Sequence, residues 1–175
     1  RRLVAAGSVP AIEINGTILH DSDAIVELLE DLFPEPAMRC ADPFERAFLK
    51  SVTRFHDTRL EPVLRSLFPL VGNPEKKHRA ALVVDAMNGH LERLDRLINP
   101  QPYLGGEALS LADCAYATTL FMMEDLTSCM NLEVKCSEKI HHWRNALHHT
   151  DTVREIVDQN RSAIAKWITS KLSPA

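Results

Sequence analysis

The sequence lacks the features that mark several large classes of protein. No apolar run approaches the ~20 residues that a membrane-spanning helix needs, and no charged-then-apolar signal segment opens the chain. The net charge is −4, and lysine and arginine form no cluster that would attract nucleic acid or an anionic membrane. Internal repeats and low-complexity tracts are also absent. We therefore expect a soluble protein that binds no nucleic acid and no membrane.

Cysteine is scarce and widely spaced. The four cysteines, Cys40, Cys114, Cys129 and Cys136, form no C-x-x-C pair. This spacing is typical of reduced thiols rather than of a disulfide framework or a zinc site, so we expect a cytoplasmic protein without bound metal. What is present is ordinary globular composition, with 45% apolar and 25% charged residues. A chain of 175 residues is long enough for one or two compact domains.

The start of the chain predicts two strands and a helix. Two short runs rich in strand-forming residues, Ala11–Ile14 and Thr17–His20, are joined by Asn15-Gly16, which suits a type I′ hairpin turn. A helix from about Ser22 to Phe33 follows, because its apolar residues recur at helical spacing and Pro34 stops it.

A proline-rich connector separates this part from a helical remainder. Residues 35–41 cannot continue the helix, and everything after them has helical periodicity. We place the first domain at residues 1–34, the linker at 35–41 and an all-helical domain at 42–175. The predicted fold class is α+β, with a ββα part followed by an all-α helical bundle.

The helical domain is expected to open with two helices. The first is long, continues past Pro62 and is kinked near Thr58, because proline has no N–H to donate. Its apolar stripe consists of Phe44, Phe48, Val52 and Phe55. The second helix is predicted to start with Asn73 as N-cap and Pro74 at its first position, and to end before Asn99-Pro100.

The sharpest local signal precedes the third of these helices. Ser110 and Asp113 form an Asp version of the capping box, in which each side chain bonds to the other residue's N–H. The residues that follow are apolar nearly all round, so we expect this helix in the middle of the bundle. Two more helices complete the prediction, with apolar residues Ile140, Trp143 and Leu147 on one and Val153, Ile156, Val157, Ile164, Trp167 and Ile168 on the other.

Two dipeptides that flank the hairpin point to function. A proline at the first strand position permits a cis bond, and Val9-Pro10 then turns the backbone of Val9 toward an extended peptide. Ser22 and the first N–H groups of its helix suit a carboxylate, because a helix N-terminus carries partial positive charge. One short peptide with a carboxylate bridges both. Taken singly, Val9-Pro10 also fits a rigid turn and Asp21-Ser22 a simple N-cap.

These residues carry a family resemblance. Val9-Pro10-Ala11-Ile12, Asn15-Gly16 and Leu19-His20-Asp21-Ser22-Asp23-Ala24-Ile25 together resemble the glutathione-site signature of cytosolic glutathione transferases. The segments Tyr103-Leu104-Gly105-Gly106 and Leu109-Ser110-Leu111-Ala112-Asp113 resemble the motif ahead of that family's central helix. The resemblance implies a thioredoxin-like first domain, present in its C-terminal part, and the helical second domain of the glutathione transferase fold.

The resemblance also implies roles for single residues. Val9 pairs with the cysteinyl backbone of glutathione, Pro10 is cis, and Asp21 with Ser22 holds the γ-glutamyl end. Asp21 stands where the family usually has Glu or Gln. The family's activating Tyr, Ser or Cys lies in its first strand and helix, which precede the first residue here. No catalytic residue is therefore carried over, and we expect roughly 50 or more further residues upstream.

The function implied is that of a glutathione transferase, a homodimer that uses glutathione as co-substrate and directs its thiolate to a small-molecule electrophile. Two alternatives stay open. One is a noncatalytic interaction module, and the other is a thiol-dependent reductase of the same fold with a Cys nucleophile.

Further candidates lie on the helices. By resemblance the kinked helix lines the second-substrate pocket, which gives Phe55, His56 and Arg59 as candidates for an acidic co-substrate. A solvated or dimer-facing stretch with Phe55 in the core is the alternative. The pairs His141-His142 and His148-His149 are expected to be surface histidines, because neighbours on a helix point about 100° apart and no ligand set is complete.

Overall fold

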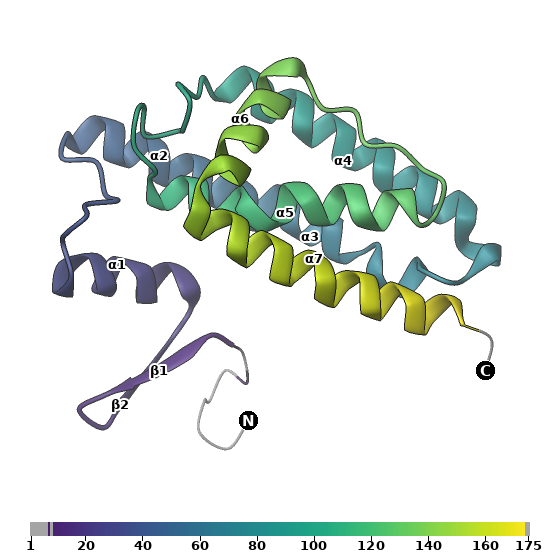
Figure 1. Cartoon of the computed structure of the whole chain (residues 1–175), viewed down its shortest axis with the longest axis horizontal. Helices are drawn as coiled ribbons and strands as arrows, with labels where there is room; N and C mark the ends of the chain where they lie inside the picture. Colours follow the sequence, from purple (N-terminus) through teal and green to yellow (C-terminus); the bar gives the residue numbers. More distant parts are fainter. Residues whose placement is uncertain (1–6, 8, 174–175) are drawn as a thin grey trace. The chain divides into compact units, whose positions relative to one another are not determined.

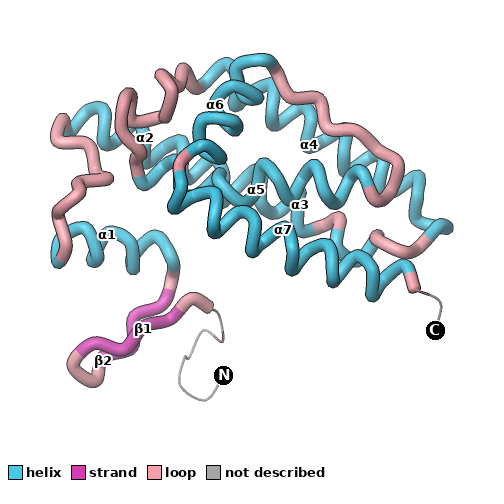
Figure 2. The backbone as a smooth tube through the Cα atoms, in the orientation of Figure 1, coloured by secondary structure: helices cyan, strands magenta, loops and turns pink. Residues whose placement is uncertain are grey.

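The computed structural model describes Gly7 and residues 9–173 (Figure 1). It divides the chain into two compact units, Arg1–Cys40 and Ala41–Ala175. The first unit holds both strands and one helix, and the second holds the remaining helices. Figure 2, coloured by secondary structure, shows the two strands before the first helix and helices and loops in the rest of the chain.

A hairpin opens the first unit. Strands β1 (Ala11–Ile14) and β2 (Thr17–His20) pair antiparallel, with the last residue of β1 opposite the first residue of β2. Between them, Asn15 has φ 50° and Gly16 has φ 77°. Both values lie in the left-handed region that a type I′ turn requires. The predicted hairpin and its turn are therefore confirmed.

Helix α1 (Ser22–Leu32) follows the hairpin and confirms the predicted helix to within one residue. Its Glu30 is 8% exposed, and the carboxylate accepts hydrogen bonds from the backbone N–H of Met38 (3.2 Å) and of Arg39 (2.9 Å). The Arg39 side chain in turn pairs with Asp31 at 2.5 Å. These bonds hold the segment that follows Pro34 against α1.

The second unit is all-helical. Its α-helices are α2 (Pro43–Phe55), α3 (Glu61–Arg65), α4 (Lys77–Leu97), α5 (Leu111–Ser128), α6 (Glu138–His149) and α7 (Asp151–Leu172). The shorter turns are the π-helical η1 (His56–Leu60) and the 3₁₀ turns η2 (Phe68–Leu70) and η3 (Pro74–Lys76). Helix α5 contacts α2, η1, α6 and α7, so its predicted place in the middle of the bundle is confirmed (Figure 1).

The core of this unit forms around α5. Its largest fully buried side chains are Trp143, Tyr116, Leu60, Leu64, Leu67, Met87, Leu91, Leu94, Ile98, Met123, Leu126 and Ile140. Three members of the predicted apolar stripes are instead exposed: Phe44 at 81%, Ile156 at 60% and Phe48 at 41%. Helical spacing places a residue on a face but does not say how far a neighbouring element covers that face.

The predicted kink takes the form of a wide turn. Helix α2 ends at Phe55, and over His56–Leu60 the chain adopts a π-helical turn in which the N–H of Glu61 bonds to the carbonyl of His56. Helix α3 then resumes with Pro62 in its first turn. The break near Thr58 is confirmed. The α-helical pattern of backbone hydrogen bonds is interrupted there, because Pro62 has no N–H to donate.

The start of α4 differs from the prediction. Pro74–Lys76 is a separate 3₁₀ turn, and α4 begins only at Lys77. The Asn73 side chain makes no capping hydrogen bond; its backbone carbonyl accepts from the N–H of Lys76 at 3.1 Å. Asn73 is therefore the N-cap of the 3₁₀ turn, without a side-chain bond, whereas the N-cap of α4 is Lys76 and not Asn73 as predicted. The predicted end, before Asn99, is confirmed by the last residue of α4.

The capping box ahead of α5 is present, and its carboxylate accepts more hydrogen bonds than predicted. Asp113 is 0% exposed, and its carboxylate accepts from Ser110 twice, through the backbone N–H at 2.9 Å and the hydroxyl at 2.7 Å. The N–H of Leu104 (3.0 Å) and the indole Nε1 of Trp143 (2.8 Å) donate to the other oxygen. One carboxylate thus joins the start of α5, the loop before it and α6.

Candidate functional site

The hairpin brings together the four residues predicted to bind glutathione. The first residue of β1 lies opposite the last residue of β2. Val9 and Pro10 immediately precede β1, and Asp21 and Ser22 immediately follow β2. All four therefore lie at the same end of the hairpin, the end away from its turn, where α1 begins (Figure 1).

Val9 is exposed to solvent. It is 91% exposed, and the peptide bond to Pro10 is cis, as the resemblance implied. Of the hydrogen bonds between residues that the structure describes, none uses the backbone of Val9. Backbone N–H and C=O groups without a partner in the described part of the chain are the kind that an extended peptide pairs with, as an added strand does.

Asp21 caps α1. Its Oδ1 accepts hydrogen bonds from the N–H groups of Asp23 (3.0 Å) and Ala24 (3.3 Å), and its backbone has the positive φ of 83°. This is the N-cap role that the sequence also allowed. One carboxylate oxygen is therefore occupied by the helix, and Oδ2 is the oxygen that faces no described donor.

Ser22 offers the groups that suit an anion. It is the first residue of α1 and is exposed. Neither its hydroxyl nor its N–H is bonded to any residue within the described part of the chain. A carboxylate is favoured at this position, because the first N–H groups of a helix lack partners and carry partial positive charge.

His56 lies in the core of the helical unit rather than on its surface. It is 6% exposed, and its ring nitrogens bond to Thr119 Oγ1 and Asp57 Oδ1, each at 2.8 Å. The ring also meets the edge of Tyr116 at a centroid distance of 5.0 Å. Arg59, by contrast, is exposed. The structure therefore does not bring the imidazole to the surface that carries Arg59, and both ring nitrogens are already occupied.

Three hydroxyl or thiol groups of the helical unit have raised pKa values. Burial raises the pKa of Tyr116 far above its usual value, and the charge of Asp57 adds to the shift. Its hydroxyl donates to the carbonyl of Val52 at 2.8 Å. Burial likewise raises the pKa of the thiols of Cys129 and Cys136. A raised pKa lowers the thiolate fraction, so neither cysteine is an activated nucleophile.

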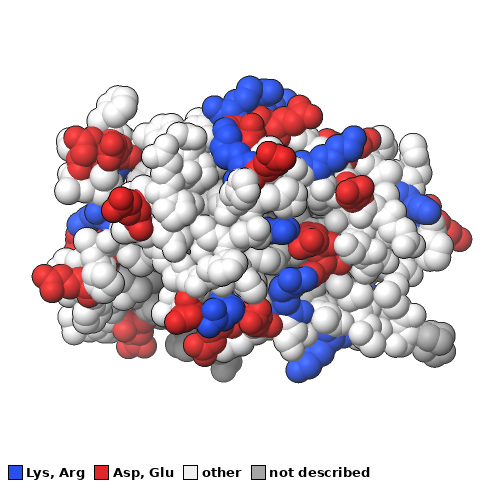
Figure 3. All heavy atoms as spheres, turned by 45° about the horizontal axis from the view of Figure 1, so that its top comes forward, with Lys and Arg blue, Asp and Glu red and all other residues white. Residues whose placement is uncertain are grey.

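Within Gly7 and residues 9–173, no group of three or more His, Cys, Asp and Glu is arranged to hold a metal ion. The four cysteines, all in that part of the chain, form no disulfide. None of the described helices is both long and apolar enough to span a membrane. On the face drawn in Figure 3, basic and acidic side chains are interspersed.

Comparison with known families decides the identity. A model described as the glutathione S-transferase N-terminal domain matches residues 1–37, and one described as its C-terminal domain matches residues 77–146. Together the two cover more than half of the chain. The chain belongs to the glutathione S-transferase family. Its β1–β2–α1 unit is accordingly the C-terminal part of a thioredoxin-like domain, and the helical unit is the family's second domain.

Individual glutathione S-transferase relatives are distant. Glutathione S-transferase U7 of Arabidopsis thaliana is 23% identical over 85% of this chain and 65% of its own length. Maleylacetoacetate isomerase of Pseudomonas aeruginosa is 29% identical over 67% of this chain and 58% of its own length. The chain thus spans less than two thirds of these relatives.

The glutathione S-transferase fold is also found among solved structures. The theta class glutathione S-transferase from Xanthomonas axonopodis pv. citri, solved with glutathione bound, has a TM-score of 0.73 and 24% identity. The match covers 89% of this chain and 74% of that one.

Proposed function

We propose that this chain binds glutathione at the hairpin end that carries Val9, Pro10, Asp21 and Ser22. The observation that carries the proposal is the register of β1 and β2, which sets the open backbone of Val9 and the open N-terminus of α1 at one end. Glutathione has a peptide backbone and an acidic end, which are the two features that these groups suit. Family membership supports the same ligand.

The roles of the residues follow from the groups that remain open. The backbone of Val9 pairs with the cysteinyl residue of glutathione. Ser22 donates from its N–H and hydroxyl to the γ-glutamyl carboxylate, and Oδ2 of Asp21 accepts from the γ-glutamyl ammonium group. Because Oδ1 of Asp21 already caps α1, the same carboxylate fixes both the helix start and the ligand.

We further propose that bound glutathione is a co-substrate whose thiolate attacks an electrophile. A free thiol has a pKa of about 8.5 and is only a few per cent thiolate at neutral pH, so the reaction requires a group that lowers this pKa. The described residues bind and position glutathione. None of them is assigned the activation of its thiol. The second-substrate role of Phe55, His56 and Arg59 stays a prediction.

The test is direct binding of glutathione by calorimetry, followed by turnover with a chloronitrobenzene electrophile. Ser22→Ala removes a hydrogen bond to a charged group and is expected to weaken binding by roughly 10-fold or more. Ser162→Ala is the matched control, because Ser162 is an exposed residue of α7. Equal affinities of the two variants would contradict the site.

The two alternatives predict different results. A noncatalytic module shows no turnover with any electrophile, whether or not it retains glutathione. A thiol-dependent reductase reduces a disulfide probe and loses that activity when its nucleophilic cysteine is replaced.

A homodimer in the cytoplasm is part of the same proposal. The exposed Phe44 and Phe48 of α2 supply apolar surface that a second subunit can cover. Sedimentation velocity at micromolar concentration tests it, and a monomeric mass would contradict it.

A further inference from the structure

A histidine of the helical unit has a buried ring nitrogen without a partner. His90 lies on α4, and its Nδ1 atom is inaccessible to solvent. This nitrogen neither donates nor accepts a hydrogen bond within the described residues. A buried polar atom without a partner costs free energy, so such atoms are rare unless another molecule satisfies them.

The surroundings of this ring are positively charged. Arg93 of α4 and Arg59 of η1 both act on His90 through their charges. Both arginines are exposed, and among the described residues neither guanidinium group takes part in an ion pair or a hydrogen bond. No carboxylate is among the groups that act on the ring. Two guanidinium groups thus act on one imidazole, and no carboxylate balances them at that ring.

Helical spacing explains why these groups meet. His90 and Arg93 are three residues apart on α4, which puts them on one face of that helix. Phe55 and Arg59 are four residues apart on the continuous run from α2 into η1. The Phe55 ring meets the edge of His90 at a centroid distance of 6.1 Å and an interplanar angle of 76°, so the two faces are in contact.

We propose that Arg59, His90 and Arg93 form a binding site for the oxyanion group of a small acidic ligand, a carboxylate or a phosphate. The planar fork of each guanidinium matches the oxygens of either group. A bound anion supplies the negative charge that the groups acting on the ring lack. The site does not depend on the glutathione proposal, because it is defined by binding alone and all its residues lie in the helical unit.

The proposal implies a definite pH dependence. Burial, and then the charges of Arg93 and Arg59, lower the pKa of His90, so the empty site holds a neutral ring at neutral pH. A bound anion favours the protonated ring, which can donate from both nitrogens. Anion affinity is therefore expected to rise as pH falls toward the range in which His90 takes up a proton.

The experiment titrates the protein with succinate and, separately, with inorganic phosphate at low ionic strength, without glutathione. Heat and the NMR signals of the His90 ring are followed. Saturable binding, tighter at about pH 6 than at about pH 8, is the expected result. Preference for one probe identifies the oxyanion as carboxylate or phosphate.

Variants separate a built site from general surface charge. Arg59→Ala and Arg93→Ala are each expected to weaken binding by roughly 5-fold, and His90→Gln to remove its pH dependence. The matched control is Arg79→Ala, an exposed arginine on the same helix. Binding that does not saturate, or that falls equally in Arg79→Ala, overturns the proposal. If His90→Gln fails to fold, the exposed arginine variants decide alone.

Discussion

Single buried polar residues determine how the helical unit holds together, and Asp113 is the clearest case. Replacing it by alanine leaves the N–H of Leu104, the indole of Trp143 and both donors of Ser110 without an acceptor. We expect Asp113→Ala to lower the free energy of unfolding by about 3 to 5 kcal/mol, because each buried donor left unpaired carries its own penalty. Urea unfolding followed by tryptophan fluorescence measures the loss.

The control for this prediction is Asp85→Ala. Asp85 is an exposed residue of α4, so its removal is expected to change stability by no more than about 0.5 kcal/mol. A loss below about 1 kcal/mol in Asp113→Ala would show that the surrounding donors find other acceptors.

At the residue scale, sequence reasoning predicts local partners and misses distant ones. The bond between Ser110 and Asp113 spans three positions and follows from the capping-box pattern. The bond from His56 to Thr119 spans 63 positions, and nothing in the local pattern around either residue indicates it. The same limit applies to His90, whose spacing to Arg93 is visible in the sequence but whose contact with Phe55 depends on how two helices pack.

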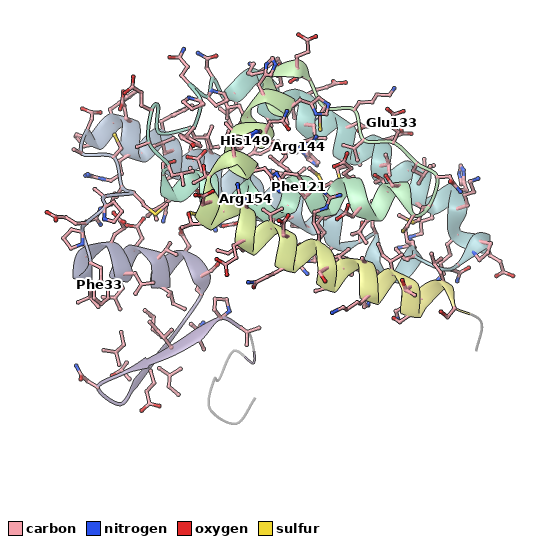
Figure 4. The ribbon with its side chains drawn as sticks, viewed as in Figure 1. Phe33, Phe121, Glu133, Arg144, His149 and Arg154 are labelled. Atoms are coloured by element: carbon pink, nitrogen blue, oxygen red, sulfur yellow. The ribbon has the colours of Figure 1, made fainter. Side chains whose placement is uncertain are left out.

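At the scale of elements, an aromatic ring on α5 joins three helices. Phe121 is 5% exposed, and the guanidinium groups of Arg144 on α6 and Arg161 on α7 lie 5.3 Å and 5.5 Å from its ring centroid. Figure 4 shows Phe121 and Arg144 side by side. Each arginine is also paired with an acidic residue of α5, Arg144 with Glu124 at 3.1 Å and Arg161 with Asp125 at 2.7 Å.

Phe121→Leu keeps an apolar side chain and removes the ring that both cations contact. We expect the free energy of unfolding to fall by about 2 to 3 kcal/mol, from lost volume and lost cation–π attraction. Met122→Leu is the control, because Met122 is a buried neighbour on α5 and the change nearly conserves volume at a cost below about 1.5 kcal/mol. Thermal unfolding compares the two, and equal losses would show that the cations contribute nothing.

Elements with strong local signals were the predictable ones. The hairpin follows from Asn15-Gly16, which supplies both positive φ values that the turn needs. The start of α4 does not follow from Asn73 and Pro74, because a 3₁₀ turn and an α-helix begin with the same residue types. The kink position followed from Pro62, whereas its π-helical form depends on packing.

At the scale of the whole molecule, the two units differ in how much core they contain. Every residue of the hydrophobic core cluster belongs to the helical unit. In the described part of the first unit, Ile25 is the one buried apolar residue, at 6% exposure. We expect residues 41–175 alone to keep their helical circular dichroism and to unfold cooperatively with heat, because their core is complete.

The matched fragment is residues 1–40, which is expected to lack cooperative unfolding alone, because so short a segment buries too little apolar surface. Loss of the near-ultraviolet signal in 41–175, with its helix content retained, would contradict the prediction.

The family itself was predictable at this scale from motifs in both units of the chain. The family models match the chain in the same order as these motifs. The N-terminal model covers Val9-Pro10 and Asp21-Ser22, and the C-terminal model covers the segment before α5. The roles of the four residues at the hairpin end remain predictions, because motif residues fix a position in the fold and the ligand itself must be measured.

The wide turn at His56–Leu60 sets the phase of the helix beyond it. A straight α-helix advances about 100° per residue, so one residue more or less rotates everything downstream by that angle. With the turn as it stands, Leu60 and Leu64 are 0% and 1% exposed. Deleting a single residue from the turn would swing both leucines toward solvent. The burial of Leu60 and Leu64 therefore constrains the length of this turn.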